Sequence, residues 1–279
     1  MKVLVTGYKG QLGYDVIKRL EYRSIECRGV DIEDFDLTDE ADVRAHLSSY
    51  APDRIIHCAA YTAVDRAEED PNTCYQVNVL GTSCIASYCA EQDIPMMYFS
   101  TDYVFDGNGE QPFEIDSPKN PQNQYGKTKS LGEDAVTHML SKYFIIRTSW
   151  VFGANGNNFV KTMIKLGKER AELRVVNDQY GSPTYTYDLA ILVADMIGTD
   201  RYGIYHATNE GICSWYEFAL KIMELSGLAA PVQPVTSSQY RTRAIRPQNS
   251  RLSKGSLDIG GFHRLPGWED ALARFLNHV

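Results

Sequence analysis

The sequence predicts an α/β fold, in which a doubly wound parallel sheet is joined by a smaller C-terminal lobe that is interleaved with it. Three observations lead to this prediction. Short apolar runs rich in β-branched residues alternate with helix-length amphipathic segments in the first half of the chain. A glycine-rich turn follows the first apolar run directly. After about Trp150 the alternation weakens, which we take as the start of the lobe.

Five apolar segments of the first half are expected to form strands, and the four segments between them helices. The strands are expected at residues 2–6, 25–30, 54–58, 95–100 and 143–148. The helices are expected at about 11–21, 39–50, 72–92 and 124–141, bounded by turn formers or by Ser, Thr or Asp caps. Because crossovers through such helices are right-handed, the strands should lie parallel, with helices on both faces.

The second half of the chain is less regular. We expect helices near 159–170, up to about 197, at 215–226 and from 268, with strands at 173–177 and 204–207. No internal repeat or low-complexity tract separates these segments from the first half. We therefore expect one domain over residues 1–150, to which segments at about 170–205 return, and a lobe formed mainly by residues 151–279.

Composition excludes several classes of protein. The chain has 279 residues, 43% hydrophobic and 23% charged, which is typical of a globular protein rather than a disordered or fibrous one. No apolar run approaches the roughly 18 to 20 residues that span a bilayer, and the N-terminus lacks the apolar region of a signal peptide. We therefore expect a cytoplasmic protein without a membrane anchor. The six cysteines show neither Cys-x-x-Cys nor zinc-ligand spacing, so disulfides and a structural metal are not expected.

The charge is unevenly distributed along the chain. A net charge of −8 and a pI of about 5.3 argue against a nucleic-acid partner. Residues 226–257, which we call the basic segment, nevertheless contain no acidic side chain. Basic residues accumulate there at Arg241, Arg243, Arg246, Arg251 and Lys254. We expect the basic segment to bind a small anion.

Three glycines lie where the first strand turns into the first helix. Gly7, Gly10 and Gly13 follow a Gly-x-x-Gly-x-x-Gly spacing, which allows a tight turn and a close approach of a pyrophosphate to the helix N-terminus. The alternative is a glycine-rich turn without a ligand. Asp31, about 20 residues further on at the end of the second strand, favours a dinucleotide, because a carboxylate there accepts hydrogen bonds from ribose hydroxyls. It also repels a 2′-phosphate, so the sequence favours NADH over NADPH.

Other residues around this turn complete a predicted cofactor site in the domain over residues 1–150. Asp36 and Leu37 are expected near the adenine, and the small residues after the third strand are expected to let the backbone approach a dinucleotide. An ordinary loop remains the alternative at each of these places. The predicted cofactor contacts outside the glycines are Lys9, Gln11, Leu12, Asp31, Asp36, Leu37, Ala59, Ala60 and Tyr61, together with Tyr125 and Lys129.

Tyr125 and Lys129 are the candidate catalytic pair. They are spaced i and i+4 and therefore share one face of the helix that begins near residue 124. A neighbouring ammonium favours the phenolate and is expected to lower the pKa of Tyr125 towards neutrality. Thr101 ends the fourth strand at the edge of the sheet where ligands of this fold bind, and is expected to donate a hydrogen bond to a substrate oxygen. A second Tyr-x-x-x-Lys pair, Tyr14 and Lys18, lies inside the first helix and is interpreted as a surface pair.

Taken together, these motifs resemble the extended short-chain dehydrogenase/reductases, which have a Rossmann-like fold, and within them the dTDP-4-dehydrorhamnose reductases. The resemblance runs from residue 1 to about residue 254. The motifs that carry it are Gly7/Gly10/Gly13, Ala-Ala-Tyr-Thr-Ala-Val-Asp65, Asn78, Ser-Thr-Asp-Tyr-Val-Phe105, Tyr125-x-x-x-Lys129, Arg147-Thr-Ser-Trp-Val-Phe-Gly153, Asn-Asn-Phe159 and Asp178-Gln-x-Gly-Ser-Pro-Thr184.

The resemblance implies an oxidoreductase that transfers a hydride from NADH or NADPH to C4 of a dTDP-linked 4-keto-6-deoxy sugar, forming dTDP-L-rhamnose for polysaccharides. It implies that Tyr125 protonates the C4 oxygen, that Lys129 tunes Tyr125 and holds the ribose, and that Thr101 orients the carbonyl. The lobe would bind the substrate. The residues that it implies for the substrate are Thr101, Asp102, Tyr103, Trp150, Asn158, Arg246 and Asn249.

Some relatives form dimers linked by Mg²⁺, so Mg²⁺ and a homodimer are possible beside a monomer. Asp15 and Asp188 are the candidate ligands, with surface carboxylates of structural role as the favoured interpretation. No other metal ligand is predicted.

Four other functions share parts of this pattern. Nucleotide-sugar 4,6-dehydratases need a base for the elimination of water and typically carry Thr-Asp-Glu at this strand end. Tyr103 stands in place of the glutamate here, so the base is absent and a dehydratase is disfavoured. A C4 epimerase, or a 4-ketoreductase acting on another sugar, remains open. A non-catalytic dinucleotide-binding subunit, such as the regulatory subunit of methionine adenosyltransferase, is disfavoured because Thr101, Tyr125 and Lys129 are all present.

Overall fold

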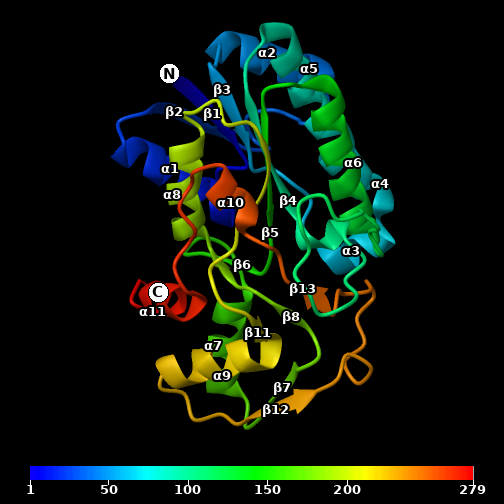
Figure 1. Ribbon diagram of the computed structural model, residues 1–279, viewed down its shortest axis with the longest axis vertical. Helices are drawn as coiled ribbons and strands as arrows, with labels where there is room; N and C mark the ends of the chain where they lie inside the picture. The colour runs from blue at the N-terminus through cyan, green and yellow to red at the C-terminus, as the bar shows by residue number, and fades with distance from the viewer. Residues whose placement is uncertain (279) are drawn as a thin grey trace.

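The structure, a computed structural model, describes residues 1–278 and is built around a six-stranded sheet (Figure 1). The five predicted strands of the first half are confirmed as β1 (Lys2–Thr6), β2 (Glu26–Val30), β3 (Arg54–His57), β4 (Met96–Thr101) and β5 (Tyr143–Thr148). The strand predicted at 204–207 joins them as β10 (Gly203–His206). The order β10-β5-β4-β3-β1-β2, with all neighbours parallel, confirms the doubly wound fold.

Helices cover both faces of the sheet. On one face α1 (Gln11–Tyr22) and α8 (Thr186–Met196) pack side by side, and on the other lie α2 (Glu40–Tyr50), α5 (Thr82–Gln92) and α6 (Gln124–Met139) (Figure 1). Each face has a buried apolar core, because the strands are apolar on both sides. The buried Arg147 of β5 donates to both carboxylate oxygens of Glu133 on α6, each at 2.8 Å, which fixes α6 against the sheet.

The helix predicted at 72–92 is interrupted. The chain forms α3 (Val64–Glu69), α4 (Pro71–Tyr75), a π-helical turn η1 (Gln76–Gly81) and only then α5. The turn η1 carries Asn78, whose side chain accepts from the backbone N–H of Tyr61 at 2.8 Å and donates to the Tyr61 carbonyl at 3.1 Å. Asn78 of this irregular turn therefore holds the loop after β3.

The lobe has its own core and three small sheets. Its helices are α7 (Phe159–Glu169), α9 (Trp215–Leu225) and α11 (Trp268–Leu276), whereas the short helix α10 (Gly255–Ile259) packs on β10 of the six-stranded sheet. Its strands are β6 (Val151–Phe152), β7 (Leu173–Val176), β8 (Tyr180–Gly181), β9 (Thr184–Tyr185), β11 (Cys213–Ser214), β12 (Val232–Val235) and β13 (Asn249–Ser250). They pair as β12-β7, β11-β8-β13 and β6-β9. Phe152, Phe218 and Phe275 lie at the centre of the core.

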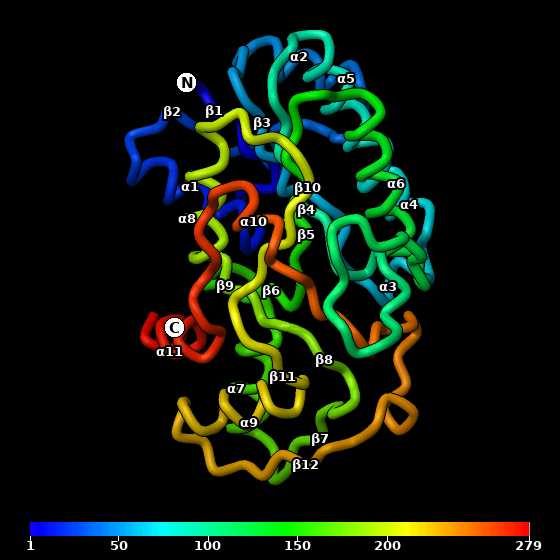
Figure 2. The backbone as a smooth tube through the Cα atoms, viewed as in Figure 1, coloured from blue at the N-terminus to red at the C-terminus, as the bar shows by residue number. Residues whose placement is uncertain are grey.

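The chain passes repeatedly between the lobe and the sheet. It leaves β5 for α7 and β7, returns through α8 to β10, and then enters the lobe again at α9 (Figure 2). The basic segment afterwards runs along the edge of the molecule towards α3 (Figure 2). Within residues 1–278, no helix combines the length and the apolar character needed to cross a membrane.

Candidate active site

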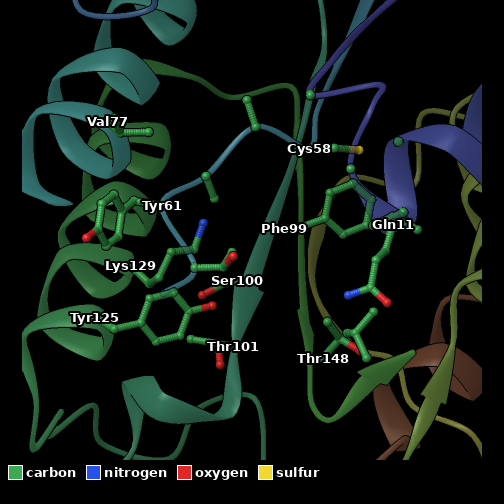
Figure 3. A pocket seen from close by; sticks show the side chains of 18 of the residues that line it. Gln11, Cys58, Tyr61, Val77, Phe99, Ser100, Thr101, Tyr125, Lys129 and Thr148 are labelled. Carbon is green, nitrogen blue, oxygen red and sulfur yellow. The ribbon is translucent and has the colours of Figure 1, made fainter. Parts of the chain in front are cut away.

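A cavity of about 860 Å³ lies at the carboxyl ends of β1, β3, β4 and β5, between the sheet and the lobe (Figure 3). This is the edge at which ligands bind in doubly wound folds. Most of the predicted site residues meet here. Those that line the cavity are Gly7, Gly10, Gln11, Leu12, Gly13, Asp31, Asp36, Leu37, Ala59, Ala60, Tyr61, Thr101, Asp102, Tyr103, Tyr125, Lys129, Trp150, Asn158 and Arg246.

The glycine turn between β1 and α1 shapes one wall of the cavity. Gly7 has a φ of +66°, and a Cβ atom there would lie 2.6 Å from the backbone nitrogen of Ala59. A Cβ atom at Gly13 would overlap the carbonyl oxygen of Gly7. Gly10 is the N-cap of α1 and has no side chain with which to cap it, so the N–H groups of the first turn are left for an anion. The turn therefore fits a pyrophosphate.

Asp31 lies at the rim of the cavity beside this turn. Its carboxylate accepts from the backbone N–H of Lys9 at 3.0 Å and of Ile32 at 2.9 Å. We expected Lys9 to contact the cofactor, but its side chain does not line the cavity. Its ammonium instead pairs with Glu33 at 2.9 Å (Nζ to Oε1). Lys9 therefore holds Asp31 through its backbone, and the Asp31 carboxylate lines the cavity where the Lys9 ammonium does not.

Asp36 and Leu37 form the far end of the cavity, where adenine is expected. The backbone N–H and the hydroxyl of Thr38 both donate to the Asp36 carboxylate at 2.8 Å, and they lower its pKa. Phe35 and Ile32, which were not predicted, also line this end. Ile32 is 80% exposed, so an adenine ring would cover an apolar side chain that is otherwise in water.

Tyr125 and Lys129 both project from α6 into the cavity (Figure 3). The helix begins at Gln124 because Asn123 caps it, its side-chain oxygen accepting from the N–H of Gly126 at 2.8 Å. Lys129 is 3% exposed, and its Nζ lies 4.0 Å from the centre of the Tyr98 ring. Burial lowers the pKa of this ammonium to about 7.

The pKa of Tyr125 is raised in the structure, whereas we expected it to be lowered. Removal of the phenol from water is the largest cause, and the nearby Asp102 carboxyl adds to it. Lys129 is not among the groups that shift this pKa, so the lowering that we expected from its ammonium is absent. The phenol is therefore protonated at neutral pH, which suits a proton donor rather than a base.

Thr101 ends β4 next to this pair, but its hydroxyl is already engaged. It donates to Asp102 Oδ1 at 2.9 Å and accepts from the backbone N–H of Tyr103 at 3.2 Å. Asp102 begins the 3₁₀ turn η2 (Asp102–Val104), and its other oxygen accepts from the hydroxyl of Ser250. Burial raises the pKa of Asp102 to about 6. The free donor that we predicted at Thr101 is therefore directed at Asp102.

An aromatic wall closes the lobe side of the cavity. Trp150 lies in the left-handed region with a φ of 50° and stacks on Trp215, their ring centres 3.8 Å apart and their planes at 16°. Phe159 packs on Trp215 with ring centres at 4.5 Å. Asn158 caps α7 and donates to Gln11 Oε1 at 3.1 Å, which joins the lobe to the glycine turn.

Arg246 brings the basic segment to the cavity, whereas Asn249 does not line it. The guanidinium of Arg246 contacts the hydroxyl of Tyr103 at 3.4 Å and pairs with Asp65 at 2.6 Å. It also lines a second cavity of about 490 Å³. The Asn249 amide instead donates to the carbonyls of Gln111 and Asn108, because in the two-residue strand β13 it is Ser250 that faces Asp102. Asn249 therefore holds the loop that contains Asn108 and Gln111, and it is not placed to contact a substrate.

Asp15 and Asp188, the candidate Mg²⁺ ligands, are buried rather than exposed as we expected. Asp15 accepts from the hydroxyl of Thr186, and Asp188 forms two hydrogen bonds of 2.7 Å with Arg274. These protein partners already occupy both carboxylates. In the described residues, no three His, Cys, Asp or Glu side chains are grouped so that they could hold a metal ion.

Two functional features were missed in the sequence. The capping box of Ser214 and Glu217 predicts where α9 begins, but the stacking of Trp215 on Trp150 depends on the relative position of the lobe and the sheet. The hydrogen bond from Ser250 to Asp102 joins residues far apart in the chain, and no local sequence pattern predicts it.

The chain is similar over its whole length to proteins of known family. The family model described as the RmlD substrate binding domain matches residues 1–279. The spore coat polysaccharide biosynthesis protein SpsK of Bacillus subtilis is 42% identical over 99% of this chain and 96% of its own. The dTDP-4-dehydrorhamnose reductase of Streptomyces griseus is 38% identical over 96% of this chain and 91% of its own. The crystal structure of dTDP-4-dehydrorhamnose reductase from Bacillus anthracis in complex with NADP is 40% identical, covers 100% of this chain and 99% of its own, and has a TM-score of 0.97.

Proposed function

Since the chain belongs to the RmlD family, whose relatives above include dTDP-4-dehydrorhamnose reductases, we propose that it reduces the C4 ketone of dTDP-4-dehydro-β-L-rhamnose to dTDP-β-L-rhamnose. The observation that supports this most directly is the meeting of Tyr125, Lys129 and the glycine turn in one cavity. NADH or NADPH, when bound, supplies the hydride that C4 receives.

The residues of this chain supply the proton and the positioning. Tyr125 donates its phenolic proton to the C4 oxygen as that oxygen gains negative charge, and its raised pKa keeps the proton available at neutral pH. Lys129 holds the ribose, since its nitrogen ends inside the cavity and ribose hydroxyls can accept from it (Figure 3).

Different residues of the cavity are suited to different parts of the substrate. Arg246 is the guanidinium that would bind the diphosphate, and its position between the two cavities leaves room for the nucleotide beyond the sugar. Trp150 and Trp215 offer an apolar surface to the methyl group of a 6-deoxy sugar. Asn158 closes the cavity between the sugar and the glycine turn.

The position of Asp31 supports NADH as the preferred cofactor. Its carboxylate, fixed by the N–H groups of Lys9 and Ile32, repels a 2′-phosphate, and the nearby Lys9 ammonium is paired with Glu33. The Bacillus anthracis relative was solved with NADP, and kinetics of this chain with NADH and with NADPH test the preference.

The experiment that tests the function is a turnover assay with purified protein, dTDP-4-dehydro-L-rhamnose and either cofactor. We expect one reduced nicotinamide to be oxidised per sugar reduced, and NMR of the product to show the rhamnose configuration. A C4 epimerase would interconvert sugars without net consumption of reductant, and a non-catalytic subunit would bind the dinucleotide without turnover. Either result would contradict the proposal.

A further inference from the structure

A hydrogen-bonded chain of three side chains connects the active-site cavity to the basic segment, to which the third of them, Ser250, belongs. Thr101 donates to Asp102 Oδ1 at 2.9 Å, and Ser250 donates to Asp102 Oδ2. All three are buried, with exposed fractions of 5%, 2% and 2% in the order Thr101, Asp102, Ser250. Ser250 belongs to β13 and does not line the cavity, so it acts on the site only through Asp102.

The number of protons in this chain limits what Thr101 can do. A hydroxyl has one hydrogen to donate, and an ionised carboxylate only accepts. While Asp102 is ionised, the hydrogen of Thr101 points to Asp102, and only an oxygen lone pair is left for the cavity. When Asp102 is protonated, its own hydrogen can be donated to Thr101, which frees the Thr101 hydrogen for an acceptor in the cavity.

Resting on the proposed function, we propose that Ser250 is a positioning residue that holds Asp102 against Thr101, and that the proton on Asp102 turns Thr101 into a donor for the sugar's C4 oxygen. A donor is needed there because this oxygen becomes negative as the hydride arrives. With a neutral Asp102, two donors, Tyr125 and Thr101, meet the same oxygen.

The surroundings of Asp102 allow both protonation states near neutral pH. Burial raises its pKa to about 6, while the hydrogen bonds from Ser250 and Thr101 oppose this rise. The other ionisable groups that face it are the phenols of Tyr103 and Tyr125, and Arg246 reaches it only through Tyr103. Across residues 1–278 no cation forms an ion pair with Asp102, so the two hydroxyls are its partners.

The test measures the titration of Asp102 and the pH dependence of turnover in the same proteins. The variants are Ser250→Ala, Ser250→Thr and Asp102→Asn, with Ser256→Ala as the matched control, because Ser256 is a buried serine of the same region that accepts from His206 instead. The protonated carboxyl of Asp102 is followed by its C=O stretch in infrared difference spectra, assigned by its loss in Asp102→Asn.

Ser250→Ala removes a donor that favours the ionised carboxylate, so the Asp102 titration should move up by about one pH unit. The fall of kcat/KM with rising pH should move up by the same amount, Ser250→Thr should restore both, and Ser256→Ala should leave both unchanged. An infrared titration or a kcat/KM profile that is the same in Ser250→Ala as in the wild type would overturn the proposal, as would a wild-type kcat/KM that rises as Asp102 ionises. Failure of the proposed function is distinguishable, because the wild type would then show no turnover while the infrared titration remains readable.

Discussion

At the scale of single residues, the proposed proton donor is Tyr125, whose desolvated phenol keeps its proton at neutral pH. We predict that Tyr125→Phe lowers kcat by about 10² to 10⁴. Cofactor binding should be retained, since Lys129 and the glycine turn are untouched. The measurement is steady-state turnover combined with a fluorescence titration of NADH.

A matched control exists in the same chain. Tyr14 and Lys18 have the same spacing, with the Lys18 ammonium 4.2 Å from the Tyr14 ring centre, but they do not line the cavity. Tyr14→Phe should therefore leave kcat unchanged. An unaltered kcat in Tyr125→Phe would refute the role of the phenol as proton donor.

Arg246 should act on the sugar nucleotide and not on the cofactor. The loss of a charge-assisted hydrogen bond costs roughly 1.5 to 3 kcal/mol, so Arg246→Ala should raise KM for the dTDP-sugar about 10- to 100-fold. The Kd for NADH should stay within twofold. Arg251→Ala is the control, because Arg251 lies 4.7 Å from the Tyr180 ring centre and lines neither cavity. Equal losses for both ligands in Arg246→Ala would mean that this part of the basic segment is only structural.

Asp31 should decide between the two cofactors. We expect Asp31→Ala to lower kcat/KM for NADH about tenfold and to raise it for NADPH, because a ribose acceptor and a repulsive charge are removed together. Steady-state kinetics with each cofactor measure this directly. Glu26→Ala, which removes an exposed carboxylate of β2 outside the cavity, should leave the ratio of the two values within twofold. A ratio that Asp31→Ala leaves at the wild-type value would contradict the assignment.

Residue-level prediction from the sequence succeeded where local spacing decides the outcome. The i and i+4 spacing was enough to bring Tyr125 and Lys129 into one cavity, and the three glycines were enough to predict the turn. The direction of the Tyr125 pKa was not accessible, because it depends on burial by distant segments. For the same reason the sequence could not tell which residue of β13 faces the site, Asn249 or Ser250.

At the scale of elements, the N-cap of α6 connects the catalytic helix to the basic segment. The Asn123 side chain accepts from Gly126 and donates to the carbonyl of Ile245, both at 2.8 Å. We predict that Asn123→Ala lowers the free energy of unfolding by about 1 to 2 kcal/mol and raises KM for the sugar nucleotide, because Arg246 follows Ile245 directly. Chemical denaturation and steady-state kinetics measure the two effects.

The two functions of Asn123 can be separated. Asn123→Asp keeps the capping oxygen and removes the donor to Ile245, so its helix should remain stable while KM still rises. A KM that stays at the wild-type value in both variants would show that the basic segment keeps its place without this contact.

Helices and strands followed from periodicity wherever each packs along its length against the core of the sheet or of the lobe. The five strands and α6, α7 and α9 began within one or two residues of the predicted positions. The region 72–92 did not follow its pattern, because Asn78 pairs with the backbone of Tyr61 and the hydroxyl of Thr128, and a π-helical turn accommodates these contacts. Such contacts lie outside any sequence window.

At the scale of the whole molecule, the buried Lys129 lowers the free energy of unfolding. Lys129 has a pKa of about 7 in the folded protein, against 10.5 for an ordinary lysine, so the folded state binds fewer protons between these values. The cost is therefore full below about pH 7 and disappears as the pH rises towards 10.5. Lys129→Met should raise the free energy of unfolding on the order of 3 kcal/mol at pH 6 and by less at pH 9.

Chemical denaturation at the two pH values checks this prediction. Lys127→Met, an exposed position on the same helix, should change the free energy of unfolding by less than about 0.5 kcal/mol at either pH. A gain for Lys129→Met that is as large at pH 9 as at pH 6 would show that packing, and not charge, is responsible.

The place of β10 has a consequence for how the protein is made. β10 pairs with the outer edge of β5, yet α7, β7 and α8 must leave the ribosome before it does. Throughout that interval the nascent chain presents the open hydrogen-bonding edge of β5 to its surroundings, and such edges recruit strands from other chains. We therefore expect fragments that end before Gly203 to aggregate more readily than the full chain, because β10 is absent and the edge of β5 stays unpaired.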